Sequence, residues 1–134
     1  YVDGMPATVV FENVTATEHQ LLLSNENGDC TAQPAVRLDA TPTVQHLVPR
    51  FSPSGARVAW VDSASSSQII TAAIDGSARH VVRTAAKLKT APPQWIDETH
   101  VSWVEDTATT ATPHLQIASA LEAWTLLQAP TTLA

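Results

Sequence analysis

The five histidines are the residues of this chain best suited to metal binding. Imidazole is the commonest neutral metal ligand, and two histidines usually ligate together when they lie at i, i+2 on a strand or i, i+4 on a helix. No two of them have such a spacing: His19, His46, His80, His100 and His114. We therefore predict no metal site and interpret these histidines as solvated or hydrogen-bonded structural groups.

Groups suited to acid, base or nucleophilic catalysis are also poorly arranged. Adjacent carboxylates occur at Asp97-Glu98 and Glu105-Asp106, but neighbours on a strand point to opposite faces and cannot act together on a substrate. Ser52 and Ser54 lack the Gly-x-Ser-x-Gly turn, and no Ser-His-Asp order is evident. Residues 25–29 favour a turn over a calcium loop, because the closing glutamate is absent. The sequence predicts no catalytic residue, no cofactor and no enzymatic activity.

The large aromatic residues offer a third kind of chemistry. An indole ring stacks on a sugar or a protein surface and keeps an N–H group for hydrogen bonding, but core packing calls for the same residue. Interface, ligand and core interpretations therefore stay open for this set: Phe11, Trp60, Trp95, Trp103 and Trp124. Separately, Asn13-Val14-Thr15 matches the N-glycosylation acceptor pattern, so modification of Asn13 is a hypothesis.

Composition limits the classes of protein to which the chain can belong. Its 134 residues are 44% hydrophobic and 15% charged, which is typical of one globular domain, residues 1–134. The formal charge of −6 argues against a nucleic-acid partner, and no apolar run is long enough to insert into a membrane. A single cysteine excludes an internal disulfide. The threonine-rich, lysine-poor composition favours an extracellular or periplasmic location.

A repeated pattern organises the chain. A valine stands two residues before a large aromatic residue, and an acidic or amide residue follows, in three segments: 8–13, 57–62 and 100–106. A second apolar run follows each segment, at 20–23, 68–71 and 114–117, and an apolar pair ends each unit, at 36 and 38, 81 and 82, and 126 and 127. Short opening pieces, 48–52 and 93–96, precede only the second and third units.

Four antiparallel strands every 40 to 50 residues are typical of β-propeller blades. We therefore predict an all-β fold of three four-stranded blade-like repeats, at about 1–44, 45–90 and 91–134, with the opening strand of the first repeat missing. Closed propellers have roughly four to eight blades, so three blades form an incomplete ring.

The most regular repeat carries a family resemblance. Residues 49–60, followed by 68–76, resemble a blade of the TolB-type propeller family, with its Pro-x-aromatic-Ser-Pro-Asp-Gly turn; Ser54 stands where Asp is usual. The resemblance extends over 49–83 and is weaker at 93–98. It implies structural roles in turns for Pro53, Gly55, Asp75 and Gly76. It does not imply an activity, because such blades occur in assembly proteins, enzyme gating domains and surface proteins.

The incomplete ring leads to three functional hypotheses. The leading one is a non-catalytic extracellular structural or interaction module whose open faces are completed by self-association with homo-oligomer or filament neighbours, as in a fibre. The second is an oligomeric carbohydrate-binding propeller, with glycans as partners of the tryptophans. The third is a part of a larger propeller, either a TolB-like scaffold or the gating domain of a prolyl-oligopeptidase-like enzyme.

Overall fold

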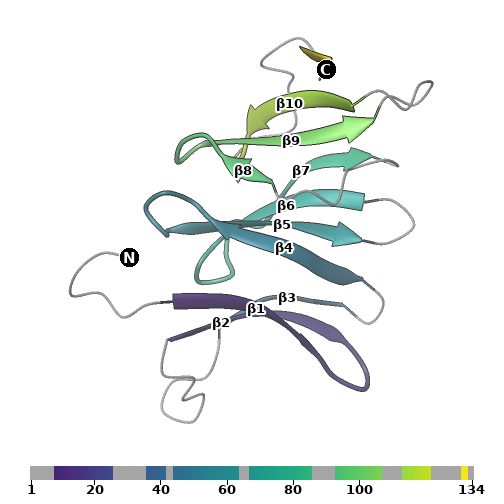
Figure 1. Ribbon diagram of the computed structural model, residues 1–134. Helices are drawn as coiled ribbons and strands as arrows, with labels where there is room; N and C mark the ends of the chain where they lie inside the picture. Colours follow the sequence, from purple (N-terminus) through teal and green to yellow (C-terminus); the bar gives the residue numbers. More distant parts are fainter. Residues whose placement is uncertain are drawn as a thin grey trace.

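The chain folds into three antiparallel β-sheets stacked one on another, as the computed structural model shows (Figure 1). The structure describes residues 8–25, 36–41, 44–63, 67–85, 93–106, 113–121 and 131–132. Every regular element within these ranges is a strand, which confirms the all-β fold class. In that part of the chain there is also no helix that could cross a membrane. We call the sheets the first, second and third blade in chain order.

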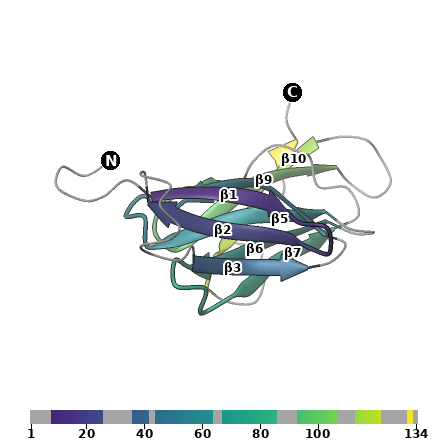
Figure 2. The ribbon, with the colours of Figure 1, turned by 90° about the horizontal axis from the view of Figure 1, so that it is seen from below.

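Each blade is a meander whose strands follow chain order. The first contains β1 (Thr8–Val14), β2 (His19–Asn25) and β3 (Val36–Thr41). The second contains β4 (Gln45–Phe51), β5 (Arg57–Ser63), β6 (Ser67–Ala73) and β7 (His80–Ala85). The third contains β8 (Gln94–Trp95), β9 (His100–Asp106), β10 (Pro113–Ser119) and β11 (Thr131–Thr132). Viewed along the stack, the first blade lies in front of the other two (Figure 2).

The strand positions follow the repeat that the sequence shows. The opening strands of the second and third repeats are β4 and β8, and the described part of the first blade has three strands. The predicted closing pair at 126 and 127 lies outside the described residues, and Thr131–Thr132 pairs there with β10 instead. Most of residues 25–29, for which a turn is predicted, also lies outside them.

Local backbone chemistry determines how the second blade turns. Val48 has a positive φ of 47° at a β-bulge in β4, and the following Pro49 has no N–H to donate to a neighbouring strand. Gly55, with φ 75°, and Gly76, with φ 83°, adopt the left-handed conformation that most side chains disfavour. These turns are therefore tight, and they hold the strand ends close together.

Alternation along the strands gives each blade two apolar faces. On β5, Val58 and Trp60 pack in one buried cluster with Leu21, Leu23 and Leu38 of the first blade. The intervening Ala59 and Val61 pack in a second cluster with residues of the third blade, among them Val101, Trp103 and Ala118. Successive strand residues point to opposite faces, so the second blade is buried on both sides. Apolar packing between sheets therefore holds the stack together.

Candidate functional site

Four turns meet at one end of the stacked sheets and form a continuous edge. In an antiparallel meander, alternate turns lie at the same end. Direct hydrogen bonds link these turns: Ile74 N to Ala56 O at 3.1 Å, and Ala120 N to Thr99 O at 2.7 Å. We call this edge the turn rim and define it as residues 52–56, 74–79, 96–99 and 119–121. It spans the second and third blades.

Exposed apolar side chains gather on the turn rim. Ile74, Ile96 and Leu121 are 41%, 52% and 47% exposed. The remaining large exposed apolar residue among those described is Val14, 61% exposed, at the end of β1 that leads into the opposite edge. Single exposed apolar residues are ordinary, but several on one rigid edge are typical of a contact surface.

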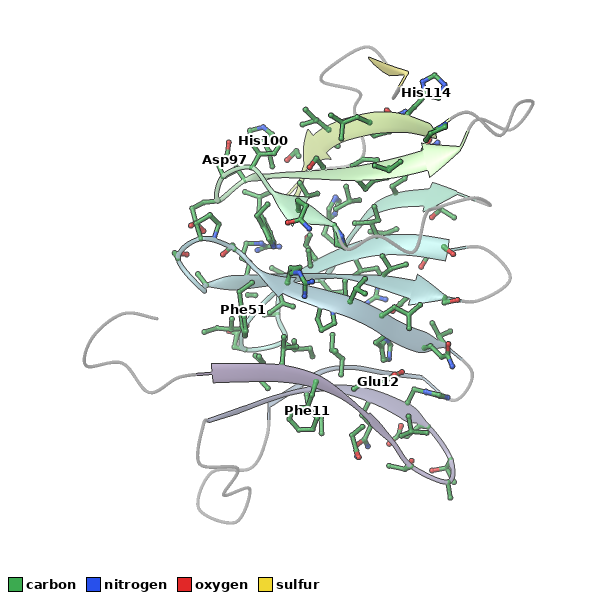
Figure 3. All side chains as sticks on the ribbon, in the orientation of Figure 1. Phe11, Glu12, Phe51, Asp97, His100 and His114 are labelled. Atoms are coloured by element: carbon green, nitrogen blue, oxygen red, sulfur yellow. The ribbon has the colours of Figure 1, made fainter. Side chains whose placement is uncertain are left out.

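Carboxylates follow two of these apolar side chains directly in the chain, Asp75 after Ile74 and Asp97 after Ile96, and local hydrogen bonds keep them ionised. The backbone N–H of Thr99 and the His100 ring lower the pKa of Asp97 to about 2. The Ser77 hydroxyl and backbone N–H lower the pKa of Asp75. Figure 3 shows Asp97 and His100 together at the β8–β9 turn. The turn rim is therefore apolar and negatively charged at neutral pH.

One carboxylate on the turn rim links two blades. The Ser54 hydroxyl, in the β4–β5 turn, donates to Glu98 Oε2 in the β8–β9 turn at 2.7 Å, and the Ser54 backbone N–H donates to Glu98 Oε1. These bonds lower the pKa of Glu98. Ser54 and Glu98 occupy equivalent positions in successive repeats. An aspartate at position 54, the residue usual in the TolB-type pattern, would place two carboxylates together.

A buried polar cluster joins the first and second blades. His46 Nδ1 lies 2.6 Å from Asp62 Oδ1, and both side chains are buried. The Trp60 indole N–H donates to the same Asp62 oxygen at 2.7 Å. Glu12 accepts the His46 backbone N–H at 3.0 Å and contacts the His19 ring at 3.0 Å. We call Glu12, His19, His46 and Asp62 the His46 cluster.

The His46–Asp62 pair resembles the orienting half of a catalytic triad, but its surroundings rule out that role. In a triad the second ring nitrogen faces a nucleophilic hydroxyl. Here His46 Nε2 lies 3.3 Å from the backbone carbonyl oxygen of His19. Both ring nitrogens thus face oxygen atoms of the protein, an arrangement that suits a structural imidazole. The cluster ties two blades together and contains no nucleophile.

A buried ion pair joins the second and third blades. Arg83 of β7 donates to both carboxylate oxygens of Glu105 on β9, at 3.0 and 2.8 Å, and the Trp103 N–H donates to Glu105 at 3.0 Å. Burial opposes ionisation of Glu105, but the bonds from Arg83 and Trp103 outweigh it and lower its pKa. The bond to Glu105 in turn raises the pKa of Arg83. For both Trp60 and Trp103, the side chain at i+2 is therefore the acceptor of the indole N–H.

The residues singled out in the sequence have mostly structural surroundings. Trp60 and Trp103 are buried at 0% and 4% exposure, so neither presents a ring face to a ligand. Trp95 packs against the core between the second and third blades, and its N–H donates to the Arg50 carbonyl oxygen at 3.0 Å. Phe11 is partly buried on the first blade, and Trp124 lies outside the described residues.

The hypothesised acceptor and turn residues lie on strands and turns. The Asn13 side-chain amide donates to Gln20 Oε1 at 3.0 Å within the first blade. Pro53 and Gly55 lie in the β4–β5 turn, and Asp75 and Gly76 lie in the β6–β7 turn. No group of three His, Cys, Asp or Glu side chains that could hold a metal ion occurs among the described residues.

Sequence analysis missed two buried side-chain pairs, His46 with Asp62 inside the second blade and Arg83 with Glu105 between the second and third blades. His46 and Asp62 are 16 residues apart, and Arg83 and Glu105 are 22 apart, so no local spacing brings them together. The signal that was available is the Trp-x-Asp and Trp-x-Glu pattern at 60–62 and 103–105. A strand places i and i+2 on one face, so the indole N–H and the carboxylate are neighbours there.

No family model and no curated protein matches the chain. Solved structures do match, at 12% to 13% sequence identity. The β-propeller domain of the Trilobed protease from Pyrococcus furiosus, described as having an open velcro topology, matches over 95% of this chain with TM-score 0.63 and 13% identity. An acylaminoacyl peptidase from Pyrococcus horikoshii matches over 94% with TM-score 0.61 and 12% identity.

A further acylaminoacyl peptidase, solved with Z-Gly-Gly-Phe-chloromethyl ketone, matches over 90% of this chain with TM-score 0.56 and 13% identity. The chain spans 39%, 23% and 22% of the lengths of these three proteins, in the same order. TolB-type membership stays a prediction, since no family model matches. The likeness shows the fold, which is a set of β-propeller blades that do not close a ring.

Proposed function

We propose that this chain is a non-catalytic part of a peptidase-associated β-propeller, with the turn rim as the surface that docks on a peptidase domain. The observation that carries the proposal is the gathering of Ile74, Ile96 and Leu121 on one rigid edge. The three structural neighbours, a propeller domain of a protease and two acylaminoacyl peptidases, support the association with a peptidase.

The physical role follows from rigidity rather than from chemistry. Inter-blade bonds such as Ser54 to Glu98 and Trp95 to Arg50 hold the turn rim as one unit. A rigid edge beside an active site limits the size of the peptide that can reach it, because the edge does not move aside. An edge that is already ordered by folding also loses less entropy when it docks. The blades would therefore act as a gate or scaffold, and the partner domain would supply the nucleophile.

The carbohydrate-binding hypothesis receives less support. Sugar stacking needs an exposed ring face, and Trp60 and Trp103 are enclosed between blades with their N–H groups bonded to Asp62 and Glu105. An extracellular or periplasmic location and a fibre role stay predictions.

Two measurements test the peptidase association. Antibodies against this chain, used on native material, should detect a protein or complex that reacts with a fluorophosphonate probe for serine hydrolases. Ile96→Asp and Leu121→Asp should weaken its association with the peptidase domain at least tenfold, since each places a charge in an apolar contact. Val14→Asp is the matched control, because Val14 is as exposed but lies off the turn rim. Absence of probe labelling in the captured material would refute the proposal.

A further inference from the structure

The outward face of the first blade repeats a face that is buried elsewhere in the stack. Trp60 pairs with Ile70 across β5 and β6, and both are completely buried against the first blade. The equivalent pair across β1 and β2 is Phe11 with Leu22. Both are only partly buried, and Phe11 points away from the stack in Figure 3, whereas Glu12 points into it. We call Phe11, Asn13, Gln20 and Leu22 the leading face.

The outward face of the third blade repeats the other buried face. Val61 pairs with Ile69 across β5 and β6, and both pack against the third blade. The equivalent pair across β9 and β10 is Val104 with Leu115. Because Val101, Trp103 and Ala118 point into the stack, their neighbours Val104, Leu115 and Ile117 point away from it, and these are only partly buried. We call these three residues the trailing face.

The leading and trailing faces resemble the two sides of the contact between the second and third blades. Between the second and third blades, the aromatic ring of Trp103 packs in one cluster with Val61 and Ile69. The leading face offers Phe11 in the position of Trp103, and the trailing face offers Val104 and Leu115 in the positions of Val61 and Ile69. An aromatic residue of one face can therefore meet an aliphatic pair of the other in the geometry of the internal contact.

The polar residues of the leading face also suit burial. Trp60 and Trp103 each need a carboxylate acceptor for an indole N–H. Asp62 then contacts His46 of its own blade, and Glu105 needs Arg83 across the interface. Phe11 has no N–H, and Asn13 stands at the position of the carboxylate. The Asn13 amide is already bonded to Gln20. The leading face can thus be covered by a partner that supplies no cation. The trailing face meets this condition, because its three residues are uncharged.

We propose that the leading face of one copy of this chain docks on the trailing face of a second copy, so that two copies close a six-bladed ring. Six blades lie within the range of closed propellers. With strands about 4.8 Å apart and residues about 3.4 Å apart, three strands of six or seven residues cover roughly 300 Å². One contact of this size is small beside the roughly 800 Å² per partner of a standard interface.

A closed ring of two copies forms two such contacts at once, whereas an open dimer forms only one. The closed ring is therefore the more stable of the two arrangements. The inference concerns the chain by itself and does not depend on the peptidase association, since neither face includes a residue of the turn rim. A failure to self-associate would leave the turn-rim proposal in place, and absence of peptidase labelling would leave this one in place.

The test is sedimentation velocity of the purified chain from about 5 to 200 µM in 0.15 M NaCl, where surface charges are screened beyond about 8 Å. The wild type should sediment as a dimer of a 14.3 kDa chain. F11K and L115D, each alone, should weaken dimerisation at least tenfold. An equimolar mixture of the two should dimerise again, because one contact is then unaltered and the other opposes lysine to aspartate.

Matched controls separate docking from loss of folding. Ile96→Lys and Ile96→Asp place the same charges on an exposed apolar residue outside both faces and should leave the dimer unchanged. Far-ultraviolet circular dichroism identifies any variant that fails to fold, and Leu22→Lys with Ile117→Asp is then the second pair. A monomeric wild type at 200 µM, or a mixture no more associated than its components, overturns the proposal. If L115D still dimerises as tightly as the wild type, the contact must join two leading faces. That result also overturns the proposal.

Discussion

Glu105 is the side chain whose neutralisation tests how the blades are joined. Its carboxylate accepts two bonds from Arg83 and one from Trp103, and its side chain is 10% exposed. Glu105→Gln keeps an oxygen that can accept the Trp103 N–H but removes the charge that balances Arg83. The change isolates the ionic part of the contact between the second and third blades.

The expected cost follows from the burial of the pair. A hydrogen bond to a charged group contributes about 1.5 to 3 kcal/mol, and breaking a buried pair costs about 3 to 5 kcal/mol. Arg83 keeps partial access to solvent at 28% exposure, so we expect about 2 kcal/mol for Glu105→Gln. Arg83→Met combined with Glu105→Gln should cost about 1 kcal/mol less than the sum of the single changes, since neither charge is then left unbalanced.

Urea unfolding followed by tryptophan fluorescence measures these costs, because Trp103 lies in the contact. A protein concentration of about 1 µM keeps self-association out of the measurement. The lowered pKa of Glu105 means that the ionised pair stabilises the fold above the unfolded glutamate pKa of about 4.3, and this stabilisation is lost as pH falls through the folded value. Glu105→Gln should remove that part of the acid sensitivity. A cost below about 0.5 kcal/mol, or additive single changes, would refute the reasoning.

Three further substitutions test other contacts. Ser54→Asp should lower the melting temperature at pH 7, because it replaces hydrogen bonds to Glu98 with repulsion between carboxylates; the loss should shrink near pH 4, and Ser54→Ala should show no such recovery. Gly55→Ala should cost about 1 kcal/mol in urea unfolding through its φ of 75° alone, since no atom lies within 4 Å of the added Cβ; a cost above 3 kcal/mol would contradict this. His46→Leu should cost about 3 kcal/mol, because it removes the ring nitrogen that lies 2.6 Å from the buried Asp62 carboxylate, and an unchanged urea midpoint would exclude that role.

The strands could be predicted from the sequence because their pattern is local. A valine two residues before an aromatic residue places both on one strand face, and this pattern recurs in β1, β5 and β9. The turns followed from Gly55 and Gly76, whose positive φ angles only glycine adopts readily. In each of these cases the physical cause acts within a few residues.

The candidate site could not be predicted in the same way because it depends on how blades stack. Ile74, Ile96 and Leu121 belong to three different turns, and only antiparallel pairing brings those turns to one edge. The bond from Ser54 to Glu98 joins residues 44 apart. The equivalence of their positions in the repeat was visible, but the contact between equivalent positions of adjacent blades requires the three-dimensional stack.

The difference between the first repeat and the others connects packing with association. A buried tryptophan needs a hydrogen-bond acceptor, which its own strand supplies two residues on, and a buried carboxylate needs a cation. Trp103, Glu105 and Arg83 show both, with Arg83 supplied by the neighbouring blade. Phe11 has no N–H and needs no acceptor, so Asn13 can stand in place of the carboxylate. The Asn13 amide bonds to Gln20 within the same blade. The first blade can therefore be buried by any neutral aliphatic sheet face, and the trailing face of the third blade is one.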